Sequence, residues 1–136
     1  MSSSHRFRFD VTWSPPAPVI TVAVAARADD EHVLFRALLD SGADVSVLPP
    51  TVVEGLNLYA TESRDLEAFD DGVQRRHAAD LYEVHIALPG GVAQGNLQAL
   101  GHEFVLGQEY IILGRDVLNM WRVTLDGPRL AGEISV

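Results

Sequence analysis

A stretch of strict alternation in the second half of the chain constrains the fold more than any other sequence feature. Between Tyr82 and Leu88, every second residue is a large apolar one, and the residues between them are polar or small. A period of two residues places the two sets on opposite faces of an extended strand. The dipeptide Asp71-Gly72 precedes this arm and suits a two-residue turn that needs positive φ. We therefore predict a long β-hairpin made by residues 66–73 and 74–88, with Asp71-Gly72 at its tip.

The rest of the chain is also built of short apolar runs separated by turn residues, which favours strands. Further strands are predicted at 6–11, 21–26, 33–39, 45–48, 92–100, 103–106, 110–113, 123–125 and 130–136, the last two as a terminal hairpin. Helical structure is expected at two places: a short turn capped by Thr51 and ending at Glu54, and one convincing helix over Arg115–Trp121. Short strands at this spacing predict an all-β, barrel-like fold.

Size and composition favour one domain held by packing alone. The chain has 136 residues, of which 47% are hydrophobic, and it has no cysteine. A single core is feasible at this length. Disulfide scaffolds, zinc ribbons, iron–sulfur sites and thiol catalysis are excluded. We therefore treat residues 1–136 as one domain, in which residues 1–16 form an N-terminal arm.

The charge balance and the apolar segments argue against two classes of partner. Ten basic residues face nineteen acidic ones, so the net charge is −9, the opposite of a duplex-binding surface. The longest low-charge run, residues 11–26, is too short and too broken by prolines to span a bilayer. We expect no nucleic-acid partner and no membrane contact. The first residues lack the apolar core of a secretory signal, so we expect cytoplasmic residence.

Histidines and glycines give no sign of a metal or cofactor site. The five histidines, at positions 5, 32, 77, 85 and 102, show neither a His-x-His nor a His-Glu-x-x-His spacing. His85 falls on the polar side of its strand, which predicts a solvated ring rather than a ligand. The sequence shows no phosphate-cradling glycine loop. We therefore expect neither a metal nor a cofactor.

The residues with the clearest chemical content lie where an apolar strand ends. Directly after Ala37–Leu39, a carboxylate, a hydroxyl and a glycine follow in Asp40, Ser41 and Gly42. Gly42 lets the backbone turn tightly around the acid. Asp-Ser-Gly is also common turn chemistry. The tripeptide alone therefore leaves a plain turn and an active-site acid equally open.

Two flanking patterns change that balance. Residues 37–48, ALLDSGADVSVL, closely resemble the active-site loop of the retropepsin-like aspartic proteases, in which Asp-Thr/Ser-Gly-Ala follows two apolar residues and precedes an apolar strand. Residues 111–116, IILGRD, resemble the family's apolar-apolar-Gly-Arg block. Either motif is weak alone, whereas the pair in this order is specific. The resemblance covers roughly residues 17–130 and implies the acid-protease barrel, with one short C-terminal helix and a flap hairpin.

The resemblance implies an aspartic endopeptidase that acts on peptides or proteins as a homodimer. Such enzymes activate a water between two facing carboxylates that share one proton, and this chain has a single Asp-Ser/Thr-Gly triplet. Asp40 is then the catalytic residue, and its symmetry mate comes from a second copy. Ser41 takes the hydroxyl position that links the two active-site loops. Gly42 and Ala43 take positions beside the carboxylate pair.

An ion pair and a hairpin complete the implied site. Asp44 matches an acid that holds the substrate backbone and pairs with Arg115, although two ordinary surface charges are a competing interpretation. The flap is expected at Phe69, Asp70, Asp71, Gly72 and Val73. This tip is acidic, unlike the glycine-rich tip of viral members, and bacterial-looking relatives resemble it better. Its charges fit either basic or polar peptide substrates or a simply solvated loop.

Two points stay open on the residues alone. The family dimerises partly through interleaved termini. Here either residues 6–11 or residues 130–136 could supply that interface, or form an ordinary edge strand of the monomer. The fold could also serve as a catalytically weak or inactive module that binds peptides or dimerises.

Overall fold

The computed structural model of the chain describes residues 4–70, 72–90, 94–101 and 109–136. Its strands are β1 (Ser4–Arg8), β2 (Val19–Ala25), β3 (Val33–Leu39), β4 (Val47–Leu48), β5 (Ala60–Asp70), β6 (Val73–Ala87), β7 (Gly95–Gly101), β8 (Ile111–Leu113), β9 (Arg122–Asp126) and β10 (Ala131–Ser135). Its helices are α1 (Pro50–Gly55) and α2 (Arg115–Leu118). The predicted all-β class is confirmed. The strand predicted at 103–106 lies outside the described residues.

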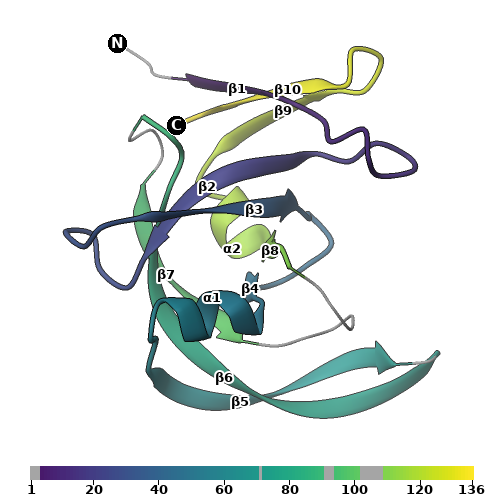
Figure 1. Cartoon of the computed structure of the whole chain (residues 1–136). Coiled ribbons are helices and arrows are strands. Elements are labelled where there is room, and N and C mark those ends of the chain that lie inside the picture. The colour runs from purple at the N-terminus through teal and green to yellow at the C-terminus, as the bar shows by residue number, and fades with distance from the viewer. Residues whose placement is uncertain (1–3, 71, 91–93, 102–108) are drawn as a thin grey trace.

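Six of the strands close into a barrel. Their order is β2-β3-β8-β4-β7-β6, and antiparallel pairing of β6 with β2, in the register Val24↔Ile86, closes the ring. β5 lies outside the ring and pairs with β6 to form the long hairpin (Figure 1). In a closed barrel of this size, the inward side chains of the strands fill the interior.

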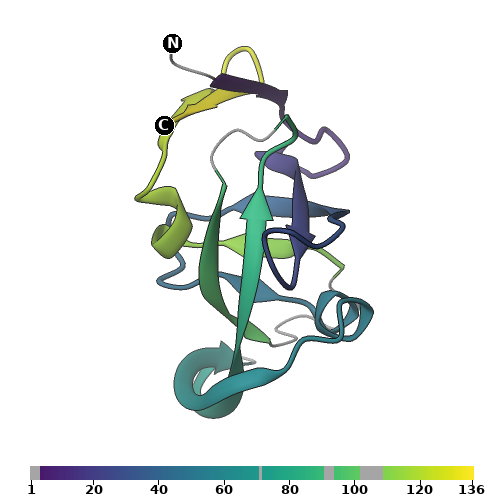
Figure 2. The ribbon, with the colours of Figure 1, turned by 90° about the vertical axis from the view of Figure 1, so that its left-hand side faces the viewer.

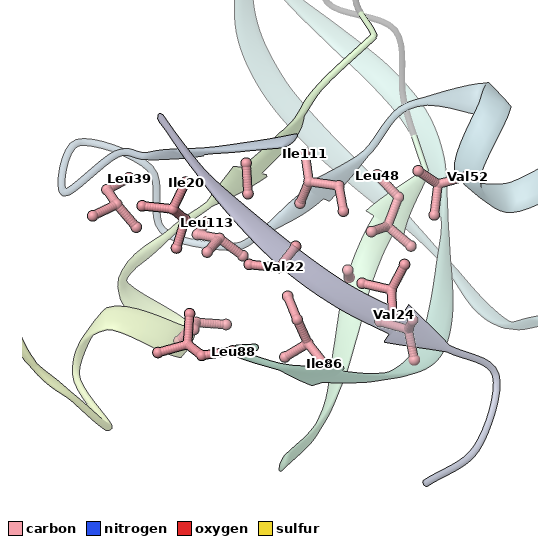
Figure 3. Packing of buried hydrophobic residues seen from close by; sticks show 14 of the residues in the cluster. Ile20, Val22, Val24, Leu39, Leu48, Val52, Ile86, Leu88, Ile111 and Leu113 are labelled. Atoms are coloured by element: carbon pink, nitrogen blue, oxygen red, sulfur yellow. The ribbon is translucent and has the colours of Figure 1, made fainter. Parts of the chain in front are cut away.

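The barrel interior holds the main hydrophobic core. Val22 and Val24 of β2 are fully buried and lie among Ile86 of β6 and Ile111 and Leu113 of β8 (Figure 3). Burial of a side chain of this size contributes about 1.5–3 kcal/mol. The alternation seen in the sequence of the β6 arm therefore marks its core-facing residues.

A separate sheet of three strands lies across one end of the barrel (Figures 1 and 2). Its order is β1-β10-β9 with antiparallel pairing throughout, so the two ends of the chain pair within one molecule. Ile134 of β10 is fully buried, and Phe7 and Val123 pack against the main core. A Cβ at Gly132 would lie 2.4 Å from Phe7 Cζ and 2.7 Å from the backbone carbonyl oxygen of Thr124, so the close approach of β9 and of this ring requires glycine here. Within the single chain, β1 and β9 are the edge strands of this sheet.

The helical turn predicted at residues 51–54 lies within helix α1, but its predicted cap is wrong. α1 is a second helix, and it begins at Pro50, after Pro49 at the N-cap, with no side-chain cap. Thr51 therefore does not cap it. Val52 is fully buried in the main core, and this tertiary packing stabilises a helix too short to persist alone.

The C-terminal helix is also shorter than predicted. α2 ends at Leu118 rather than at Trp121, because the amides of Met120 and Trp121 bond carbonyls three residues back, at Val117 and Leu118. That spacing is typical of a tightening turn. Among the described residues, no helix is long and apolar enough to cross a bilayer.

His85 is buried, which contradicts the predicted solvated ring. It is 3% exposed, because β2 and β7 flank its strand and His32, after the β2–β3 turn, lies against its ring. The Asp30 carbonyl can only accept, so His32 Nδ1, 2.8 Å away, carries a proton. In the tautomer with its proton on Nδ1, His32 accepts at Nε2 from His85 Nδ1, at 2.7 Å. Burial, and secondarily the neighbouring His32, lowers the pKa of His85.

Acid is expected to destabilise the fold through His85. Its pKa in the folded chain lies below the ordinary value of 6.5, so the unfolded chain binds the proton first, and stability falls as the pH drops below about 6.5. His85→Asn keeps a donor near the Nδ1 position. Between about pH 7.5 and pH 5.5, its melting temperature should fall less than that of the wild type.

A second histidine variant controls for general acid effects. His5 lies on β1 in the terminal sheet, away from the pair. His5→Asn should therefore lose as much melting temperature as the wild type over the same pH range. Equal losses in the wild type and in His85→Asn would contradict the role of the buried ring.

Candidate active site

Parallel pairing of β3 with β8 brings the two sequence motifs together. Leu39 pairs with Leu113 at the ends of these strands, and the amide of Asp40 donates to the Leu113 carbonyl at 2.9 Å. The chain therefore leaves both strands at one place. Asp40 begins the first loop and Gly114 begins the second.

Asp40 lies in a tight turn at the end of β3. The amide of Ala43 donates to the Asp40 carbonyl at 3.2 Å, and the amide of Gly42 donates to Asp40 Oδ1 at 2.9 Å. A Cβ at Gly42 would lie 3.2 Å from that same oxygen, so glycine allows the carboxylate to fold over its own turn. The side chain is half-buried. Within the described residues, its Oδ2 has no hydrogen-bond partner.

An arginine from the second loop binds the first. Arg115 forms an ion pair with Asp44 through Nη2 and donates to the Ser41 carbonyl through Nη1 at 2.7 Å. Its backbone amide donates to the Ala43 carbonyl at 2.8 Å. The structure thus brings the predicted pair together. Because both side chains are exposed, the ion pair adds little stability, and its main effect is to orient the loop that carries Asp40.

Two polar residues without a predicted role hold the loops from the inner side. Ser46 is fully buried, and its amide and hydroxyl donate to the two carboxylate oxygens of Asp116 at 2.9 and 2.8 Å. The amide of Gly114 donates to Ser46 Oγ at 3.1 Å. The one sequence signal for this contact is a serine between two valines, because a buried hydroxyl needs a partner.

Gly114 is required by the close approach of the two loops. A Cβ there would lie 2.7 Å from the carbonyl carbon of Val45 and 2.8 Å from the carbonyl oxygen of Ala43. These are backbone atoms, which cannot rotate away. The glycine of the second motif therefore allows its loop to pack closely against the loop of the first motif.

The Asp40 loop opens into a cavity of about 770 Å³ beside the β5–β6 hairpin. The loop lines it with residues 40 and 42–45, and the barrel contributes an apolar wall of Val47, Leu100 and Ile112. The hairpin contributes Arg64, Asp65, Glu67 and Gln74. In Figure 1, this hairpin projects beyond the barrel on the side where β3 ends. A cavity of this size suits a short peptide segment.

The hairpin begins earlier in the chain than predicted and turns where predicted. The register Asp70↔Val73 leaves a two-residue turn, and Gly72 has a φ of 77°. That positive φ is what an Asp-Gly turn requires. Val73 is exposed. Residue Asp71 and the side chains of Phe69 and Asp70 lie outside the described part of the chain, so their predicted roles stay predictions.

The charged side chains on the hairpin pair with one another in solvent. Arg64 lies 3.1 Å from Glu62, and Glu67 lies 3.5 Å from Arg76. Gln74 also donates to Glu67 at 2.7 Å. The acidic side chains of the tip itself, Asp70 and Asp71, lie outside the described part of the chain, so both interpretations of its charge stay open. Within the described ranges, no three potential metal ligands come together.

A closed barrel with an acid-bearing loop at a cavity and a projecting hairpin defines the acid-protease class of domain. The sequence profile of the family described as retroviral aspartyl protease matches residues 14–126. The chain therefore belongs to the retroviral aspartyl protease family, and the resemblance inferred from the two motifs is confirmed. A comparison with curated proteins gives no match.

Solved structures show the same fold. The retropepsin-like aspartic protease from Rickettsia conorii has a TM-score of 0.63 and 11% identity, over 99% of this chain and 94% of that one. The protease of simian foamy virus (mac) has a TM-score of 0.52 and 15% identity, over 75% and 92%. The EIAV protease, solved with the inhibitor HBY-793, has a TM-score of 0.50 and 24% identity, over 76% and 86%. The predicted retropepsin-like barrel is confirmed.

Proposed function

We propose that the chain is an aspartic endopeptidase that cleaves peptide or protein substrates as a homodimer, with Asp40 as its catalytic residue. The supporting observation is the Asp40 carboxylate itself. It lines a peptide-sized cavity, and the Gly42 amide holds one of its oxygens. Because the sequence has one Asp-Ser-Gly triplet, the second carboxylate must come from a second copy related by a twofold axis.

Two facing Asp40 carboxyl groups divide the chemistry between them. Like charges at hydrogen-bond distance cannot both ionise easily, so the pair shares one proton. The ionised carboxylate takes a proton from a water, whose oxygen attacks the peptide carbonyl carbon. The protonated carboxyl donates to the carbonyl oxygen. The C–N bond then breaks as a proton reaches the leaving amine, with no covalent enzyme intermediate.

The remaining loop residues position this pair and the substrate. Arg115 holds Asp44 at the cavity wall, where that carboxylate can accept from a substrate backbone amide. The exposed Ser41 hydroxyl has no partner among the described residues, and we assign it to the contact between the two copies' loops. The β5–β6 hairpin takes the role of the flap, since it lines the cavity beside Asp40.

A mixing experiment tests the shared site. Wild-type chain at constant concentration is titrated with the Asp40→Asn chain, and cleavage of a peptide library is followed. Mixed dimers hold only one carboxylate, so cleavage by the wild type should fall steadily as the variant is added. Specific activity of the wild type alone should also rise with protein concentration. Specific activity that changes neither with the added Asp40→Asn chain nor with the wild-type concentration would contradict a dimeric site.

A further inference from the structure

β9 is an edge strand with one side open. In the order β1-β10-β9, no described strand pairs with its outer edge. The amide of Phe9 donates to the Leu130 carbonyl on the β1 side of β10. Backbone groups of successive residues in an antiparallel strand point to alternate sides, so in this register Thr124 bonds toward β10. The amide and carbonyl groups of Val123 and Leu125 therefore point outward.

The sequence of β9, RVTLD, is complementary to itself when two copies run antiparallel. With Thr124 on a twofold axis, Val123 lies opposite Leu125 of the second copy, and Arg122 lies opposite Asp126. The two apolar residues share one face of the sheet and the two charged residues share the other. The outward amide and carbonyl of Val123 then lie opposite the carbonyl and amide of Leu125 in the second copy, and the same pair forms on the other side of the axis.

The single chain leaves the side chains of this edge exposed. Leu125 is 54% exposed, although it lies on the same face of the sheet as the partly buried Val123. Arg122 is exposed, and Asp126 accepts from the Arg129 amide at 3.2 Å and forms a 3.7 Å ion pair with the more exposed Arg129 side chain. A strand with this pattern gains from pairing, because unlike charges directly opposite across strands are stabilising.

The other free edge of the sheet is less suited to a second copy. Antiparallel pairing of two β1 strands about Phe7 would put Arg6 opposite Arg8 of the second copy, twice. Like charges in that position are destabilising. Arg129 lines the same hollow as Arg6 and Arg8, and Arg6 lies 3.6 Å from Glu133 of β10, so these residues carry more positive than negative charge.

We propose that β9 is the strand through which two copies of this chain associate, by antiparallel pairing centred on Thr124. The pairing would join the two three-stranded sheets into one continuous sheet. Its twofold axis is perpendicular to the sheet. Because the terminal sheet and the β5–β6 hairpin lie at opposite ends of the molecule (Figure 1), this axis runs along the molecule and keeps both hairpins at one end. The inference rests on the proposed dimeric function and names the surface that function uses.

Charge reversal with complementation tests the strand pairing. Arg122→Glu sets two carboxylates against each other at both ends of the paired strands, and Asp126→Arg sets two guanidinium groups there. Each variant alone should raise the dimer dissociation constant, measured by sedimentation, at least about tenfold. In an equal mixture, the heterodimer has two attractive contacts, so its dissociation constant should return to within about threefold of the wild-type value. The rise in the dissociation constant that each single variant causes should be smaller at high salt.

Two control variants make the outcome decisive. Arg6→Glu makes the same charge change on the opposite edge and should leave the dissociation constant unchanged. Arg122→Gln removes the charge without reversing it, so it should fold even if Arg122→Glu does not. It should raise the dissociation constant by a smaller factor than Arg122→Glu. Single variants that dimerise like the wild type, or a mixture that fails to restore the dimer, would overturn the β9 interface.

The same measurements separate this inference from the proposed function. If the wild type dimerises and the Asp40→Asn chain inhibits it, while Arg122→Glu has no effect, the β9 interface is wrong and the dimeric protease stands. If the wild type sediments as a monomer at every concentration, both are wrong.

Discussion

Asparagine in place of Asp40 is expected to abolish peptide cleavage without unfolding the protein. The variant keeps an oxygen that accepts from the Gly42 amide, which the carboxylate does at 2.9 Å, so the turn should persist. In the proposed dimer, it removes both proton-transferring groups at once. Loss of general acid–base chemistry on this scale lowers the rate by at least about 10³-fold. Cleavage of a peptide library and thermal unfolding of the same samples measure the two effects.

Asp29→Asn is the matched control for this variant. Asp29 is exposed on the β2–β3 turn, so the same chemical change there should alter neither cleavage nor unfolding. If Asp40→Asn cleaves as fast as the wild type, Asp40 is not catalytic. If the wild type binds peptides and cleaves none, the binding module becomes the better description.

Alanine in place of Asp116 is expected to cause the largest loss of stability. The fully buried Ser46 donates its amide and its hydroxyl to this carboxylate, and alanine leaves both donors without an acceptor. Hydrogen bonds to a charged group contribute about 1.5–3 kcal/mol each, so the free energy of unfolding should fall by about 3–5 kcal/mol. That is a large share of the total for a domain of this size. Urea unfolding followed by tryptophan fluorescence measures it.

A graded series distinguishes lost hydrogen bonds from a general effect of charge. Asp116→Asn retains one acceptor oxygen and should lose less stability than Asp116→Ala. Asp29→Ala removes an exposed carboxylate and should change the unfolding free energy by no more than about 0.5 kcal/mol. Equal unfolding midpoints for Asp116→Ala and the wild type would show that the Ser46 contact is dispensable.

The strands and the tip of the hairpin could be predicted because their signals are local. Alternation between Tyr82 and Leu88 depends only on the pleat of one strand, and the turn at Gly72 depends on positive φ at one residue. The helices were predicted less well. α1 depends on a buried contact at Val52, and such a contact exists only after the barrel has formed.

The candidate site divides in the same way. Asp40 and its turn could be found from neighbouring residues, because Asp-Ser-Gly bonds within itself. The bond from Ser46 to Asp116 joins residues 70 positions apart, and the bond between His32 and His85 joins residues 53 apart. No local pattern specifies either contact. A position on the polar side of a strand predicts a solvent-exposed side chain only when nothing packs over it. At His85 this fails, because the ring of His32 lies against it.

The sequence by itself determined the β class, the hairpin turn, the family and the single Asp-Ser-Gly triplet, because each follows from residues adjacent in the chain or from motifs in a set order. The tertiary structure alone decided how the two loops are held, which histidine is buried and where the termini lie. It pairs β1 with β10 inside one molecule and leaves β9 as a free edge. The physical reason is barrel closure, which brings distant residues into contact and determines which polar groups must find partners away from water.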